Sequence, residues 1–427
     1  MKLSRRDVMG GGIALCGGVF MGIHGAIAKS DVCSSMVSHN VVTGFEGLRA
    51  GHYEVLRGRK VGLVANPTSV GRNLHHIADI MHADGGVDLQ AIFGPEHGFR
   101  GSAPAGSSEE KARDPNTGVM VYDIYDVSGP RLDAIIRSSG IDTMVFDIQD
   151  VGARFYTYIS TLYDTMAACA RLGIDYVVLD RPNPISGVRV GGPVLDPHFA
   201  SFIGRQAIPI QHGMTVCELA SLFNACFIPT ISGRSVRLRN ITMTGWTRDM
   251  FFDQTGLPWI PPSPNMPTLQ TAIAYPGTCM FEGTNLSVGR GTAMPFLYLG
   301  GPKLDATAWR DRMEQSGLAG VAFREVAFSP AAFVDRGGMD HGVQVIITGR
   351  ERFDAVRTGL TLLSTLRDLT GGVPWRGKDA RTFDLIMGTD AVRHQLDQGM
   401  MPDAIIQSWQ PGLVQFMEIR KKYVLYS

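Results

Sequence analysis

The 427-residue sequence has no excess of charge of either sign, because 40 lysine and arginine residues balance 40 aspartate and glutamate residues. A chain without net charge has no long-range field toward nucleic acid or an anionic membrane, so a charged ligand must be met by a local cluster. The sequence also lacks an apolar run of the roughly 20 residues needed to cross a bilayer. We therefore expect a globular protein that binds no nucleic acid and keeps no integral membrane segment after signal removal.

Cysteine is also scarce, and its spacing excludes the usual metal motifs. Five of the six cysteines lie beyond residue 28, and none forms a CxxC pair or another metal-ligand spacing; they are Cys33, Cys169, Cys217, Cys226 and Cys279. We expect no metal, and we interpret these cysteines as small buried hydrophobic residues, except for Cys33 in the leader.

The amino terminus has the pattern of an export signal. Paired arginines in "SRRDVM", a short glycine-rich apolar stretch and the small residues "AIA" at Ala26–Ala28 are typical of the twin-arginine pathway. The sequence predicts a signal peptide over 1–28, a disordered leader over 29–43, contact with the twin-arginine translocase during export, and a periplasmic protein.

From Lys60 onward, short β-branched runs alternate with helical patterns. The runs "KVGLVAN", "LQAIF", "TMVFDIQD" and "YVVLD" predict an α/β domain with a mainly parallel sheet covered on both faces. The proline-rich stretch "LPWIPPSPNMPT" ends this pattern. Beyond it, two strands surrounded by helices predict a smaller α+β domain, so that the domains span 44–260 and 265–427.

Polar clusters follow three of the predicted strands directly, in "GPEHG", "DIQD" and "DRPNP". Because the carboxyl ends of parallel strands lie at one edge of a sheet, we expect these clusters to share a pocket. The candidate residues are Glu96, His97, Arg100, Asp147, Asp150, Arg154, Asp180 and Arg181. Glu96 is the strongest candidate, since a carboxylate between a proline and a histidine is poorly placed to cap a helix. Alternatively, Asp180 caps the next helix, and Asp147 and Asp150 form a structural ion pair with Arg154.

Two later stretches add candidates for substrate binding. In "QHGMT", His212 lines the rim or fills a loop, and Thr215 is a suitable helix N-cap. The glycine-rich stretch from Tyr275 to Phe296 carries Glu282, Asn285 and Arg290. An arginine there could hold a ligand carboxylate in a bidentate fork, or else pair with Glu282 and hold the loop.

From about Gly44 to Ser427 the chain resembles the bacterial exo-β-N-acetylmuramidases of the NamZ type, formerly the DUF1343 domain of unknown function. The resemblance rests on "GPEHGFRG", "VFDIQDVGARFYTY", "VLDRPNP", "PIQHGMT", "PPSPNMPT", "FEGTNLSVGRGTAMPF", "FDLIMGTDAVR" and "RKKYVLYS". It implies a Rossmann-like amino-terminal domain, an auxiliary carboxy-terminal domain and an active-site cleft between them. It also implies release of N-acetylmuramic acid from the non-reducing end of peptidoglycan fragments, with Glu96 in the position of the proposed catalytic glutamate.

Glycosidic cleavage needs an acid at the leaving oxygen and a second group that activates water or stabilises the cationic centre. We assign the acid to Glu96, and the second group is Asp150, Asp147 or the substrate's own acetamido group. No cofactor is expected. One rival is a cofactor-binding oxidoreductase, which is disfavoured because the first strand-to-helix turn, "VANPTSVGRN", lacks GxGxxG. The other is a non-catalytic protein that binds cell-wall fragments.

Overall fold

The computed structural model describes residues 40–427, and the predicted signal peptide and Cys33 lie outside this range. The described residues belong to one compact unit. No helix in the described part is both long and apolar enough to cross a membrane. Residues 40–43, which the sequence assigns to the leader, contact this unit: Val42 pairs antiparallel with Thr244, and Thr43 caps the first helix.

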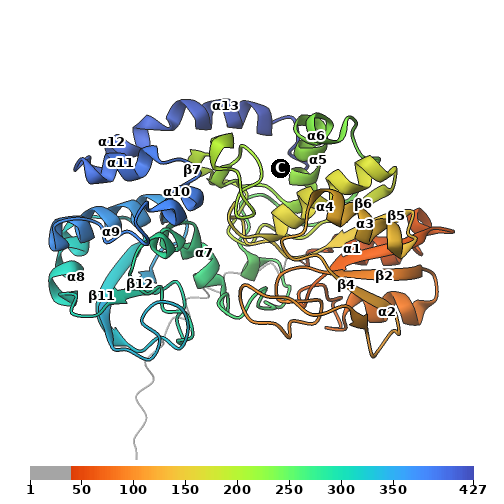
Figure 1. Cartoon of the computed structure of the whole chain (residues 1–427), viewed down its shortest axis with the longest axis horizontal. Coiled ribbons are helices and arrows are strands. Elements are labelled where there is room, and N and C mark those ends of the chain that lie inside the picture. Colours follow the sequence, from red (N-terminus) through yellow and green to blue (C-terminus); the bar gives the residue numbers. More distant parts are fainter. Residues whose placement is uncertain (1–39) are drawn as a thin grey trace, which may run out of the picture. The chain divides into compact units, whose positions relative to one another are not determined.

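A seven-stranded sheet with the order β3-β4-β2-β1-β5-β6-β9 forms the centre of the first part (Figure 1). The strands are β1 Lys60–Ala65, β2 Asp88–Gly94, β3 Ala112–Arg113, β4 Met120–Asp123, β5 Thr143–Asp147, β6 Asp175–Leu179 and β9 Leu238–Ile241. Neighbouring strands pair in parallel, except that the short β3 runs antiparallel to β4. The predicted mainly parallel sheet is confirmed.

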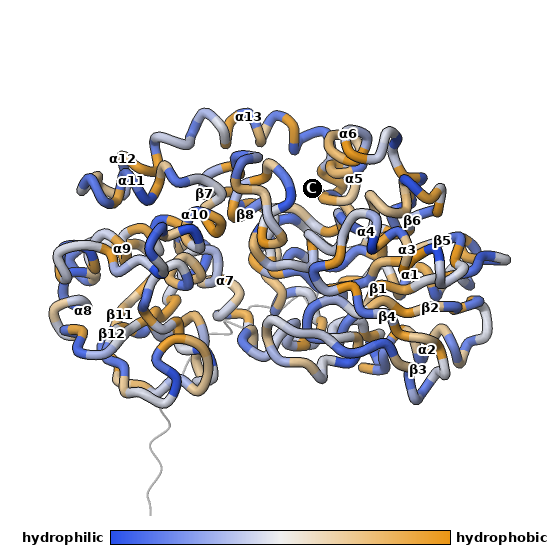
Figure 2. The backbone as a smooth tube through the Cα atoms, viewed as in Figure 1, coloured by the Kyte–Doolittle hydropathy of each residue, from blue (hydrophilic) through white to orange (hydrophobic). Residues whose placement is uncertain are grey.

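Helices cover both faces of this sheet because its central strands are apolar on both sides. In β5, Met144 and Phe146 face one buried cluster with α3 and α4, while Val145 faces the cluster of α1 and α2. Figure 2 shows hydrophobic residues along these strands. Burying one such side chain contributes about 1.5–3 kcal/mol. The helices are α1 Gly44–Ala50, α2 Ile77–Asp84, α3 Gly129–Ser139, α4 Tyr158–Leu172, α5 Val216–Cys226 and α6 Ile228–Ser232.

The second part is built around a three-stranded antiparallel sheet, which fits the predicted α+β class but has one strand more than the two that the sequence indicated. Its order is β10-β12-β11, with β10 Tyr298–Gly301, β11 Val321–Phe328 and β12 Asp340–Ile347. Its helices are α7 Leu269–Thr278, α8 Ala306–Gln315, α9 Ala355–Thr370, α10 Arg381–Met387, α11 Ala391–Asp397, α12 Pro402–Ser408 and α13 Gln410–Arg420. A separate two-stranded pair consists of β7 Gly191–Val194 and β8 Pro209–Gln211.

Two features differ from expectation. Helix α7 begins directly after the prolines and runs into the glycine-rich stretch, although it contains the poor helix formers Pro276 and Gly277. A Cβ at Gly277 would lie 1.8 Å from the Ala355 carbonyl oxygen, so glycine here permits close packing on α9. Cys226 is exposed rather than buried, because it ends α5 at the surface, 3.3 Å from the Tyr423 hydroxyl.

Candidate active site

The carboxyl ends of β1, β2, β5 and β6 lie at one edge of the sheet. Strand β1 is followed by β2 on one side, whereas its other neighbour is β5, so the strand order reverses between β1 and β5. Ligands of open α/β sheets bind in the crevice at such a switch point. The segments that follow the four strands therefore define the region in which the predicted site residues must be located.

Glu96 follows β2 in a tight loop whose backbone requires left-handed residues, His97 at φ 71° and Gly98 at φ 79°. The Gly106 amide donates to Glu96 Oε1 at 3.0 Å, and the Thr157 hydroxyl donates to Oε2 at 2.8 Å. Within the described residues neither lysine nor arginine pairs with this half-buried carboxylate. Glu96 is thus oriented by two neutral donors.

Asp150 lies after β5 and is almost fully buried. Its Oδ2 accepts a hydrogen bond from the Gly152 amide at 2.7 Å, while its Oδ1 has no partner within the described residues. The fully buried His212 accepts at Nδ1 from the Met214 amide at 3.2 Å, so the ring proton is on Nε2. Nε2 lies 3.4 Å from Asp150 Oδ2. His212 therefore contacts the second carboxylate of the site.

A tyrosine-rich segment at the start of α4 lies close to both carboxylates. The rings of Tyr156 and Tyr158 are 5.2 Å apart, and the Tyr158 hydroxyl donates to the Pro262 carbonyl oxygen at 2.6 Å. Burial raises the pKa of both hydroxyls well above the usual value, and the negative charges of Glu96 and Asp150 add to this effect. Both tyrosines are therefore within electrostatic reach of both carboxylates.

The turn after β1 adds a further polar side chain. Asn66 Oδ1 accepts from the amide and the hydroxyl of Thr68, which leaves Asn66 Nδ2 without a partner among the described residues. The buried Tyr156 hydroxyl is unpartnered as well. Buried polar atoms almost always have partners, so one free acceptor on Asp150 and two free donors at the same edge mark a site for a polar ligand.

The same turn does not suit a nucleotide. The amide of Asn66 donates to Ser69 Oγ and that of Thr68 to Asn66 Oδ1, while the amides of Ser69 and Val70 donate to carbonyl oxygens within the turn. Pyrophosphate sites need backbone N–H groups that point at the ligand. The geometry therefore argues against the oxidoreductase reading.

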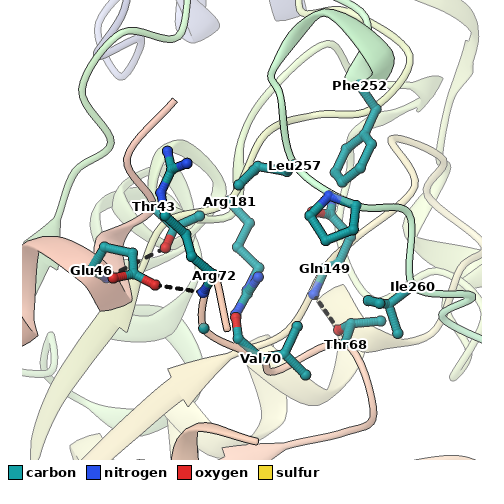
Figure 3. A pocket seen from close by; sticks show the side chains of 12 residues that line it. Thr43, Glu46, Thr68, Val70, Arg72, Gln149, Arg181, Phe252, Leu257 and Ile260 are labelled. Atoms are coloured by element: carbon teal, nitrogen blue, oxygen red, sulfur yellow. Dashed lines mark hydrogen bonds between the residues drawn. The ribbon is translucent and has the colours of Figure 1, made fainter. Parts of the chain in front are cut away.

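Figure 3 shows a pocket at the switch point, which we call the switch-point pocket. Thr68, Gln149 and Arg181, which follow β1, β5 and β6, line it. The lining also includes the apolar side chains Phe252, Leu257, Pro258 and Ile260, together with the carboxylate of Glu46. The space between these residues, about 410 Å³, includes open solvent. It lies beside Asp150 and does not include Glu96.

Asp147 forms a buried ion pair with Arg181, which lines this pocket. Nε of Arg181 donates to Oδ1 of Asp147, and Nη2 donates to Oδ2 at 2.8 Å. Asp147 is fully buried, and its partner is Arg181 rather than Arg154. The structural reading of Asp147 is therefore favoured, with a different arginine from the one expected.

The contacts of Asp180 also favour a structural role. It is fully buried and accepts hydrogen bonds from the Thr215 hydroxyl, the Cys217 amide and the Tyr426 hydroxyl. Burial raises its pKa to about 7. It braces the amino terminus of α5, and the predicted N-cap Thr215 is confirmed, with Glu218 completing a capping box.

The other basic side chains predicted to line the site bond to neighbouring residues of the protein. Arg100 pairs with Asp79 at 2.7 Å and with Asp114 at 2.8 Å. Arg154 donates to three backbone carbonyl oxygens, those of Pro193, Ile208 and Ile386, and burial lowers its pKa to about 9. His97 Nδ1 donates to the Ala103 carbonyl oxygen at 3.1 Å. These contacts favour a structural role for the three side chains, because their donors hold loops together.

The candidate residues in the second part of the chain also bond to neighbouring residues of the protein. Arg290 pairs with Glu282 through Nε, and its guanidinium lies 4.9 Å from the Phe296 ring centroid and 4.6 Å from that of Phe333. Asn285 Nδ2 donates to the Trp375 carbonyl oxygen at 3.0 Å. These contacts favour the alternative in which Arg290 holds the loop.

Sequence reasoning did not select Asn66, Thr68, Tyr156, Thr157 or Tyr158. Each follows a strand of the predicted sheet, as Glu96 and Asp150 do. That position was the available signal, and the stretch "VANPTSVGRN" that follows β1 carries two of these residues, Asn66 and Thr68. Among residues 40–427, no group of three or more His, Cys, Asp or Glu side chains is arranged to hold a metal ion.

A half-buried glutamate and a second carboxylate at the edge of an α/β sheet are the groups that glycoside hydrolysis requires. Residues 61–270 match the family model "Exo-beta-N-acetylmuramidase NamZ, N-terminal", and residues 273–426 match its C-terminal counterpart. The peptidoglycan β-N-acetylmuramidase NamZ of Bacillus subtilis (strain 168) is 40% identical over 386 residues, which are 90% of this chain and 91% of that protein.

Two solved structures of DUF1343 family proteins from Bacteroides fragilis are also similar. One has a TM-score of 0.82 at 31% identity and the other a TM-score of 0.70 at 30% identity, and each comparison covers 91% of this chain and 99% of the other. The protein is an enzyme of the glycoside hydrolase class. It belongs to the NamZ family of exo-β-N-acetylmuramidases.

Proposed function

We propose that this protein releases N-acetylmuramic acid from the non-reducing end of peptidoglycan fragments. The observation that carries the proposal is the pair Glu96 and Asp150, both close enough to Tyr156 and Tyr158 to raise the pKa of their hydroxyls, with unpartnered buried polar atoms at the same edge of the sheet. The name of the Bacillus subtilis relative, a peptidoglycan β-N-acetylmuramidase, supports this choice of substrate.

Glu96 is the general acid in this proposal. In its protonated form it gives its proton to the glycosidic oxygen as the bond from that oxygen to C1 of the sugar breaks. The Thr157 hydroxyl and the Gly106 amide hold the carboxyl group in one orientation. Since Arg100 is paired with Asp79 and Asp114, no guanidinium competes for the Glu96 carboxylate.

Asp150 is the second catalytic group. An acetamido substituent has one N–H donor and one carbonyl acceptor, and the free Asp150 Oδ1 complements the former. Asn66 Nδ2 and the Tyr156 hydroxyl complement the latter. With its N–H held by Asp150, the acetamido oxygen attacks C1 and forms an oxazolinium ion. Water then opens this ring and transfers its proton to Glu96.

NMR of the first product separates this route from direct attack by water. The acetamido route retains the β-configuration at C1, whereas a single displacement by water activated by Asp150 gives the α-anomer.

We also propose the domain assignment and the export route. Residues 44–260 form the catalytic domain and 265–427 an auxiliary domain, with the active-site cleft between them; the two family models, which divide between 270 and 273, support this division. The paired arginines Arg5 and Arg6 direct export through the twin-arginine translocase to the periplasm. Export that persists after Arg5→Lys with Arg6→Lys would contradict this assignment.

The test of function is turnover of 4-nitrophenyl β-N-acetylmuramide and of the matching glucosaminide by the purified mature protein. We expect hydrolysis of the muramide with a clear preference over the glucosaminide. A protein that binds muramyl fragments without turning over either glycoside would be a binding protein instead.

A further inference from the structure

The switch-point pocket contains a guanidinium group with one unused edge. Nε and Nη2 of Arg181 donate to Asp147, and Nη2 also donates to the Val70 carbonyl oxygen at 3.1 Å. Nη1 makes no hydrogen bond to any described residue, and Arg181 lines the pocket. A buried arginine that keeps one N–H edge free is suited to donate to an anionic ligand.

The pocket is also adjacent to the atoms that complement an acetamido group. Gln149 lines the pocket and precedes Asp150 in the chain. The backbone amide of Gln149 donates to the Thr68 hydroxyl at 3.0 Å. That hydroxyl in turn donates to Asn66, whose Nδ2 is free. The pocket therefore lies next to the residues that we propose to bind the acetamido group.

N-acetylmuramic acid carries its acetamido group on C2 and a lactyl ether on C3. The lactyl ether consists of a methyl group and a carboxylate, and it is the only difference from N-acetylglucosamine. A pocket lined by a guanidinium group and by the apolar residues Leu257, Pro258 and Ile260 offers a contact for each. Neighbouring substituents on the sugar thus correspond to neighbouring sites on the protein.

Arg72, the other arginine that lines the pocket, makes different contacts. Arg72 is exposed, and its guanidinium donates from Nη2 to the Val41 carbonyl oxygen. Its backbone amide donates to Glu46 Oε1 at 2.8 Å, as Figure 3 shows. Asp147 contacts the Nε and Nη2 side of Arg181, away from Nη1. The anion-binding group is therefore Arg181 rather than Arg72.

We propose that the switch-point pocket binds the lactyl group, with Arg181 Nη1 donating to its carboxylate, and that Arg181 selects muramic over glucosamine-type sugars. This inference rests on the proposed muramidase function. The corresponding prediction for Arg290 is replaced, because Arg290 is paired with Glu282 and lies against two aromatic rings.

The test compares kcat/KM on the two 4-nitrophenyl glycosides. Arg181→Met is combined with Asp147→Asn, so that no buried carboxylate is left unpaired. We expect muramide turnover to fall by about 10- to 100-fold, the value of one charge-assisted hydrogen bond. Glucosaminide turnover should stay within about threefold of wild type, an allowance well below that loss. Equal losses on both sugars, or no change in their ratio, would overturn the proposal.

The matched control is Arg393→Met with Asp384→Asn. Arg393 donates to Asp384 through Nε and Nη2, both at 2.9 Å, which reproduces the Arg181–Asp147 geometry in the second part of the chain. We expect this control to leave the ratio between the two sugars unchanged. A similar change in the control would attribute the effect to general loss of an ion pair and overturn the proposal.

A second variant tests the pocket without removing charge. Ile260→Trp fills the pocket from its apolar lining, so it should weaken binding of free N-acetylmuramic acid in calorimetry and leave binding of N-acetylglucosamine unchanged. Unchanged muramic acid binding by Ile260→Trp would contradict the assignment. If wild type hydrolyses neither glycoside, the proposed function itself fails, whereas hydrolysis without these selective losses rejects only the role of Arg181.

Discussion

The hydroxyl of Thr157 donates to Oε2 of Glu96 at 2.8 Å. This bond joins the loop after β2 to the residue that precedes α4, although the two residues are 61 positions apart in the sequence. It orients the carboxyl group of the proposed acid from the segment that also carries Tyr156 and Tyr158. The position of the acid therefore depends on side chains that follow two different strands.

Thr157→Val removes this donor and keeps the shape of the side chain. We expect kcat to fall by roughly 10- to 100-fold, because small misplacements of catalytic groups cost about this much. Thr157→Ser, which retains the hydroxyl, should restore most of the activity. A fully active Thr157→Val enzyme would show that Glu96 does not need this contact.

Asp147 and Asp150 are predicted to respond differently to replacement by asparagine. Asp150→Asn should abolish most turnover and leave the melting temperature near that of wild type. Asp147→Asn leaves buried Arg181 without its counter-ion and should lower the free energy of unfolding by about 3–5 kcal/mol. Chemical denaturation together with muramide kinetics measures both effects. The assignment is wrong if Asp150→Asn destabilises the protein as much as Asp147→Asn does.

Arg290→Ala should reduce stability and affect both chromogenic sugars to the same extent. The substitution removes the ion pair with Glu282 and the contacts with Phe296 and Phe333. Glu282→Gln serves as the matched variant, because it breaks the same pair from the other side. A loss confined to the muramide would return Arg290 to substrate recognition.

His76 is predicted to make stability depend on pH below neutrality. Its Nδ1 accepts from the Ala78 amide and its Nε2 donates to the Asn66 carbonyl oxygen, so the folded state requires the neutral ring. Burial lowers its pKa from 6.5 to about 4. The unfolded chain therefore takes up a proton between pH 6.5 and 4 that the folded protein excludes, and folding loses stability as pH falls through this range.

His76→Asn keeps an acceptor for the cap of α2 and removes the titration. The stability advantage of wild type over this variant should shrink by about 1.4 kcal/mol per pH unit from pH 6.5 toward 4 and stay constant above 7. Urea denaturation at several pH values gives this difference. A difference that does not vary with pH would show that His76 is not responsible.

The parallel sheet was predictable because β-branched runs alternate with helical patterns and because central strands buried on both faces read as continuous apolar stretches. Glu96 and Asp150 could be identified for the same reason, since residues after parallel strands must lie at one edge. The partners of individual side chains were not predictable. Arg154 and Arg181 both follow strands, yet one donates to backbone carbonyl oxygens and the other pairs with Asp147.

Long-range contacts account for most of these differences. The carbonyl oxygen of Ile386 that accepts from Arg154 is 232 positions away in the sequence, and Tyr426, which donates to Asp180, is 246 positions away. No local pattern around Arg154 or Asp180 contains this information. The free donors Asn66 and Tyr156 were overlooked for a related reason, since their availability depends on which neighbouring side chains are already bonded.

The role of Glu96 is tested most directly by comparing Glu96→Gln with wild type on two leaving groups. A sugar is a poor leaving group that needs protonation, whereas 4-nitrophenolate is a good one. Release of N-acetylmuramic acid from a muramyl–glucosamine disaccharide should therefore fall by about 10²- to 10⁴-fold. The loss on the 4-nitrophenyl glycoside should be much smaller. A Glu96→Gln enzyme that keeps more than about a tenth of wild-type turnover on the disaccharide would contradict the account.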